Sequence, residues 1–198
     1  ITPHVIPTFH TFLLPFFTVL KDIFEKENDF LIIDVSGEVT DIALVKNKSI
    51  KESISFPLGR NFLLRRYAEI LKKPIEEIRS LLILFSEGKL NSAVREQTNK
   101  VFLPVRKEWL KMFHESIDEI ARDFLPSTVF LVADRDVTGW FMESIALEEY
   151  SQYTLSAGKF KVIPIETPLL YKYITFSGTI ERDQFMALEA IYVMKHFS

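Results

Sequence analysis

The sequence predicts an α/β domain in which a mixed β-sheet is flanked by helices. Residues 30–45 contain two apolar, β-rich runs on either side of an acidic turn with one glycine, which is typical of a hairpin. Residues 128–133 form a continuous β-rich run, as expected for a central strand that is buried on both faces. Because helical patterns separate these strands from a further strand at 161–165, we expect both antiparallel and parallel pairing.

Composition indicates an ordinary globular protein. The 198 residues are 47% hydrophobic, which is enough for a substantial core in one domain or two small lobes. The net charge of −3 comes without long runs of either sign, so nucleic acid is not an expected partner. The absence of cysteine excludes disulfides and thiolate chemistry, and the four histidines lack the spacing of metal ligands. A cytoplasmic location is the simplest interpretation.

The first half of the chain alternates helices with short strands. Around Val5 and Ile6 we expect a short strand, and residues 11–27 have apolar side chains at helical spacing. Their apolar part is too short to span a bilayer and contains Pro15, so we expect a buried helix and no membrane span. After the hairpin come a strand at 51–56, a helix at 60–72, and a helix that begins at Pro74 and stops near Gly88.

The second half continues this alternation. Residues 91–124 predict either one long helix or two helices joined near Pro104. The strand at 128–133 is followed by an acidic turn at 134–136, which leads through Gly139 into a helix at 140–147. A strand at 161–165 and a terminal helix at 183–197 complete the pattern, which contains no internal repeat.

Four segments resemble the actin-like ATPases, specifically the second half of their FtsA and PilM branch. Residues 34–41, Asp-Val-Ser-Gly-Glu-Val-Thr-Asp, are similar to the second phosphate loop of that family. Residues 55–61 resemble its Pro-Leu-Gly-Gly-Asn turn, residues 129–139 its strand and adenosine loop, and residues 183–190 its closing helix. The resemblance implies a ribonuclease-H-like sheet and a single lobe over 1–198. That lobe would be the C-terminal half of a longer protein, with a helical insert at about 74–100.

The resemblance also implies a set of nucleotide-binding residues. Asp34 would hold Mg²⁺ or orient water, while Gly37 and Thr40 would meet phosphate groups. Gly59 would shape the wall of the cleft, and Gly139 would follow the adenosine loop. From the residues alone, Asp34 is equally well explained as a cap that accepts hydrogen bonds from turn N–H groups.

Several residues depart from the family pattern. Ser36 and Glu38 replace glycines of the phosphate loop, and a Cβ atom restricts the close backbone approach that a phosphate cradle uses. Glu38 would also place a carboxylate near phosphate oxygens, and Asp134 and Arg135 stand where the adenosine loop has glycines. The first phosphate loop of the family is missing. We therefore expect no bound cofactor.

Two hypotheses about function follow. The first is a degenerate actin-like scaffold of type IV pilus or cell-division machinery with little or no ATP hydrolysis. It would bind protein partners such as the cytoplasmic tail of a membrane protein, self-associate, and sit at the inner face of the membrane. The second is an active ATPase that binds Mg-ATP between this lobe and a missing N-terminal lobe. A sugar kinase, which shares the fold, is a third possibility. A contiguous exposed apolar groove would favour the scaffold.

Overall fold

The computed structural model describes residues 12–154, 158–176 and 183–196, and the chain divides into two compact units. One unit comprises residues 27–166, and the other comprises residues 1–26 together with 167–198. The strand expected around Val5 and Ile6 lies outside the described residues.

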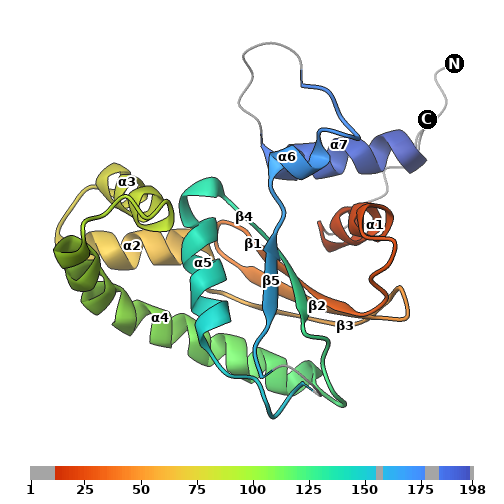
Figure 1. Cartoon of the computed structure of the whole chain (residues 1–198), viewed down its shortest axis with the longest axis horizontal. Helices are drawn as coiled ribbons and strands as arrows, with labels where there is room; N and C mark the ends of the chain where they lie inside the picture. The colour runs from red at the N-terminus through yellow and green to blue at the C-terminus, as the bar shows by residue number, and fades with distance from the viewer. Residues whose placement is uncertain (1–11, 155–157, 177–182, 197–198) are drawn as a thin grey trace, which may run out of the picture. The chain divides into compact units, whose positions relative to one another are not determined.

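The unit of residues 27–166 contains a five-stranded mixed sheet (Figure 1). Its strands are β1 (Phe30–Val35), β2 (Thr40–Lys46), β3 (Ser49–Phe56), β4 (Thr128–Ala133) and β5 (Lys161–Pro164). They lie in the order β3-β2-β1-β4-β5, with β2 antiparallel to both of its neighbours and with β1, β4 and β5 parallel. The predicted mixed α/β class is confirmed, and this order with these directions is the ribonuclease-H-like arrangement.

The described residues of the same unit form four helices: α2 (Arg60–Leu71), α3 (Ile75–Ser86), α4 (Ser92–Ile120) and α5 (Arg135–Leu147). α3 starts after Pro74 with two glutamates in its first turn, which complement the positive end of the helix. The Asn91 side chain accepts a hydrogen bond from the Val94 N–H at 2.9 Å and so caps α4. Of the two alternatives for this segment, the single long helix is correct, with Pro104 inside it.

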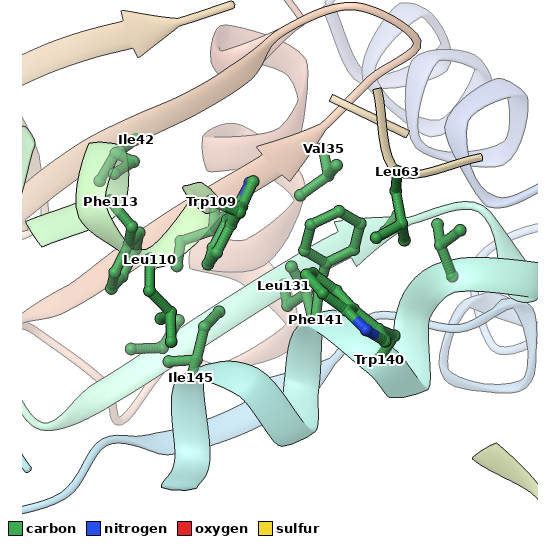
Figure 2. Close-up of a cluster of buried hydrophobic side chains, with 14 of the residues drawn as sticks. Val35, Ile42, Leu63, Trp109, Leu110, Phe113, Leu131, Trp140, Phe141 and Ile145 are labelled. Carbon is green, nitrogen blue, oxygen red and sulfur yellow. The ribbon is translucent and has the colours of Figure 1, made fainter. Parts of the chain in front are cut away.

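One face of the sheet packs on an aromatic core (Figure 2). Alternate residues of β1, such as Val35, meet side chains of α4 and α5. The Trp109 ring lies 5.1 Å from the rings of Phe113 and Phe141, and the Trp140 ring lies 4.8 Å from that of Phe141. β1 is buried along its whole length and β4 along all but its first residue, as expected for central strands.

The acidic turn expected at 134–136 is wrong, because α5 already begins at Arg135. The Thr138 hydroxyl donates to the backbone carbonyls of Ala133 and Asp134 at 2.9 Å, and the Val137 N–H donates to the Asp134 carbonyl at 3.0 Å. These bonds form the first turn of the helix directly after β4. Gly139 consequently lies inside a helix and not at the end of a loop.

The second unit contains α1 (Leu13–Ile23), α6 (Thr167–Leu170) and α7 (Gln184–His196). α1 packs against α7, with the rings of Phe12 and Phe185 5.2 Å apart and an ion pair between Asp22 and Lys195. Both longer helices were predicted, at 11–27 and 183–197, and α1 ends earlier than expected, at Ile23.

Candidate functional site

The tip of the β1–β2 hairpin, residues 36–39, is bonded to the first turn of α2. The Arg60 N–H donates to the Ser36 carbonyl at 2.9 Å, and the Asn61 N–H donates to the Gly37 carbonyl at 2.7 Å. The first N–H groups of a helix have no partner within the helix and are commonly free to bind anions. Here carbonyls of the hairpin tip satisfy two of them.

Glu38 closes the hairpin tip onto α2 through its side chain. Its two carboxylate oxygens accept from Arg65 Nη1 at 2.9 Å and Nη2 at 2.8 Å, and Asn61 Nδ2 adds a third bond at 2.9 Å. These hydrogen bonds, from Arg65 first and then Asn61, lower the pKa of Glu38 to about 2. The carboxylate is therefore charged at neutral pH and is held in a bidentate fork.

Asp34 is the last residue but one of β1, beside the hairpin tip, and is 2% exposed. Burial, followed by the charge of Asp41 directly opposite on β2, raises the pKa of Asp34 to about 7. Asp41 accepts a hydrogen bond from the Ser55 hydroxyl. Within the described residues, Asp34 Oδ1 has no hydrogen-bond partner. The capping explanation for Asp34 thus gains no support from this oxygen, and a buried acceptor without a donor is unusual.

Thr40 and Gly59 have packing roles in the same region. The Thr40 hydroxyl is buried and donates to the Leu58 carbonyl at 2.8 Å, and the Trp109 indole N–H points at both oxygens from 3.3 and 3.1 Å. A Cβ atom on Gly59 would lie 2.5 Å from the Ser36 carbonyl oxygen, so only glycine lets α2 begin this close to the hairpin tip.

Gly139 lies where α5 crosses α3. A Cβ atom there would come within 2.2 Å of Ser86 Oγ and 2.4 Å of Ser86 Cβ, so this glycine allows close helix contact. The structure thus places Asp34, Gly37, Thr40 and Gly59 together around the hairpin tip, whereas Gly139 faces α3. A nucleotide-binding role for these five residues stays a prediction.

Asp136 is the centre of an ion-pair network that the sequence did not reveal. Only 4% exposed, it accepts from Arg60 Nε at 3.0 Å and Nη2 at 2.6 Å, and from Arg79 Nε at 2.8 Å. Arg60 also lies 3.1 Å from Asp134. Burial raises the pKa of Asp136, but the hydrogen bonds from the two arginines outweigh burial and hold the pKa below its usual value. The partners are 76 and 57 residues away in sequence, so no local pattern indicates them.

A pocket of about 230 Å³ lies between α2 and α3, next to this network. We call it the arginine pocket. Its polar lining consists of Arg60, Asn61, Arg65, Glu76 and Arg79.

The region does not fit a bound Mg-nucleotide well. Its helix N–H groups, the Thr40 hydroxyl and the close approach at Gly59 are all used within the chain. Across the part of the chain that the structure describes, no three acidic or histidine side chains gather as a metal site would require. We therefore assign no reaction step to a nucleotide.

Part of this chain is similar to several solved structures. The ethanolamine utilization protein EutJ from Carboxydothermus hydrogenoformans is 24% identical, with a TM-score of 0.47 over 72% of this chain and 46% of EutJ. The PilM–PilN type IV pilus biogenesis complex is 12% identical, with a TM-score of 0.49 over 78% of this chain and 40% of that chain. The PPX-GPPA enzyme of Aquifex aeolicus is 16% identical, with a TM-score of 0.31 over 60% of this chain and 29% of that enzyme. All three belong to the actin-like ATPase superfamily. The order and directions of this chain's strands are ribonuclease-H-like.

The likeness is partial, since this chain spans less than half the length of each of those structures. No protein-family model matches the chain, and neither does any curated protein. Within the described residues, none of the helices combines the length and apolar character needed to cross a bilayer.

Proposed function

We propose that this chain is a degenerate actin-like module that acts as an assembly scaffold and hydrolyses little or no ATP. It serves type IV pilus or cell-division machinery and binds protein partners, including the cytoplasmic tail of a membrane protein, at the inner face of the membrane. It also self-associates. It binds neither nucleic acid nor a cofactor.

Closure of the hairpin tip onto α2 carries this proposal. The backbone bonds from Arg60 and Asn61, together with the Glu38 fork on Arg65, fill the space at the start of α2 with groups of the chain itself. A phosphate entering there would meet two carbonyl oxygens and, as long as Glu38 is paired with Arg65, its carboxylate, all of which repel it.

An apolar pocket at the surface supports a role in protein contacts. It has a volume of about 90 Å³ and is lined mainly by Leu71, Leu81, Val94 and Val101, from α2, α3 and α4. Val94 is 39% exposed, so apolar surface is available to a partner at this place.

Asp34 favours the alternative, an active ATPase completed by an N-terminal lobe. Asp34 Oδ1, a buried oxygen with no donor among the described residues, could hold Mg²⁺ or orient water. If that is its role, Thr40 and Gly37 would have to exchange their present contacts for phosphate contacts.

Calorimetric titration of Mg-ATP into the native-length protein, with the intact mass recorded, distinguishes the scaffold from the active ATPase. The scaffold predicts no saturable heat up to millimolar nucleotide in a folded sample. Binding at micromolar Kd, about −8 kcal/mol, would overturn the proposal. In that case Asp34→Asn should abolish the binding, whereas the matched variant Asp123→Asn, at an exposed acid, should not.

Sedimentation equilibrium of the same sample tests the assembly role. Self-association that strengthens with concentration is expected, and it should weaken in Val94→Asp because a charge would enter the apolar pocket. A strictly monomeric protein over the whole concentration range would contradict self-association.

A further inference from the structure

Three guanidinium groups converge on the arginine pocket, and each is paired with a carboxylate of the same chain. Arg65 is paired with Glu38, Arg79 with Glu76 at 3.2 Å, and Arg60 with Asp136. Three arginines around one small pocket are a typical lining for an anion site, and here the anions belong to the protein.

The internal anions differ in how firmly they are held. Asp136 is buried and receives bonds from two arginines, so it is part of the core. Glu38 stands on the hairpin tip with a side chain that is 59% exposed, and its partner Arg65 is 57% exposed. A change of side-chain rotamer can therefore carry the Glu38 carboxylate into water without disturbing the fold.

Once Glu38 has turned away, the guanidinium group of Arg65 is suited to bind an oxyanion. A guanidinium fork accepts a carboxylate or a phosphate with the same bidentate geometry, and Asn61 Nδ2 supplies a third donor beside it. A pocket of about 230 Å³ holds several water molecules, each of which occupies roughly 30 Å³ in the liquid, so a phosphate or pyrophosphate group has room.

We propose that the arginine pocket is a latent site for a phosphate-type oxyanion and that Glu38 blocks it as an internal competitor. Arg65 and Asn61 bind the oxyanion once Glu38 turns away. Arg60 and Arg79 stay neutralised by Asp134, Asp136 and Glu76, so Arg65 supplies the unpaired charge. The proposal does not rest on the proposed function, since it concerns side chains of α2 and α3 and holds for a scaffold or an ATPase.

Competition between the Glu38 carboxylate and a free oxyanion for Arg65 determines how tightly the chain should bind that oxyanion. A tethered carboxylate acts at an effective concentration in the millimolar range or above, so free oxyanion has to exceed that level to displace it. The native chain should then bind pyrophosphate only weakly. Removing the Glu38 charge should expose the site.

Calorimetric titration of sodium pyrophosphate at low ionic strength tests the proposal in four proteins. Glu38→Gln should bind at least about tenfold more tightly than the native chain, because the competing charge is gone. Adding Arg65→Gln to that variant should return binding to the native level. The matched control Glu69→Gln breaks an exposed arginine pair outside the pocket and should leave binding unchanged.

Two results would overturn the proposal. One is equal pyrophosphate affinity in Glu38→Gln and the native chain, and the other is a gain that survives the loss of Arg65. Glu38→Asp keeps the charge but shortens the side chain by one methylene, so it should release Arg65 and give a smaller gain in the same direction. Tryptophan fluorescence establishes that each variant is folded.

Discussion

Asp136→Asn is the substitution that most directly tests the ion-pair network joining α2, α3 and α5. The change keeps the shape of the side chain but removes its charge and one of its two acceptor oxygens. Arg60 and Arg79 currently donate three hydrogen bonds of 2.6 to 3.0 Å to this carboxylate. After substitution, at least one of these donors faces the N–H group of the new side-chain amide instead of an acceptor.

The expected loss of stability can be bounded from burial and geometry. Removing one partner of a buried ion pair typically costs about 3 to 5 kcal/mol. Arg60 is 18% exposed, but Arg79 is 43% exposed, so water compensates much of the second contact. We therefore expect the free energy of unfolding to fall by about 3 kcal/mol, most of it from the pairing with Arg60.

Urea denaturation followed by tryptophan fluorescence measures this loss in the unit of residues 27–166. Both tryptophans, Trp109 and Trp140, lie within residues 27–166, so the signal reports unfolding of that unit alone. With a slope of about 2 to 3 kcal/mol/M, the midpoint should drop by about 1 M. The control Asp123→Asn, at a side chain 84% exposed, should change the midpoint little. If Asp136→Asn lost less than about 0.5 kcal/mol, the network would have no net stabilising role.

Two further substitutions test the hairpin region. Asp34 has a pKa raised to about 7 in the folded chain from an ordinary 3.8, so its contribution to stability is largest below pH 3.8 and is lost as pH rises to 7. The difference between a pKa of 3.8 and one of about 7 corresponds to about 4 kcal/mol, so Asp34→Asn should stabilise the chain by about 4 kcal/mol at pH 8 and by little at pH 4. Equal effects in urea at both pH values would refute the assignment. Gly59→Ala should lower the free energy of unfolding by about 2 kcal/mol in the same assay, because its Cβ would lie 2.5 Å from the Ser36 carbonyl oxygen. The control Gly88→Ala has open space around its Cβ, so it tests only backbone strain.

Most elements of the fold could be predicted because each has a local signal. The run at 128–133 is apolar throughout since β4 is buried on both faces, and Pro74 marks the start of α3 because proline fits the first turn of a helix. The start of α5 was missed for a physical reason. Two aspartates and an arginine suggest a polar turn, but Asp136 is neutralised by arginines that only the tertiary structure brings near.

The hairpin around which four of the candidate residues lie was predicted, but its contacts were not, and a binding role for these residues stays a prediction. Sequence reasoning placed Asp34, Gly37 and Thr40 at one hairpin, and the structure does bring them together. It also noted that Glu38 would place a carboxylate there. What it could not show is that Arg65, 27 residues further on, receives that carboxylate, since the helical register of α2 relative to the hairpin is a tertiary property.

Arg60 links the two regions that the sequence suggested as separate loops. Its backbone N–H bonds to the Ser36 carbonyl of the hairpin tip, and its side chain holds Asp136 at the start of α5. Because both bonds belong to one residue at the first position of α2, loosening one end should loosen the other. Hydrogen exchange at the Arg60 amide should therefore speed up in Asp136→Asn, although the substitution lies on a different element. Unchanged exchange there would mean that the bonds from Asn61 and the Glu38–Arg65 pair hold the hairpin tip independently of Asp136.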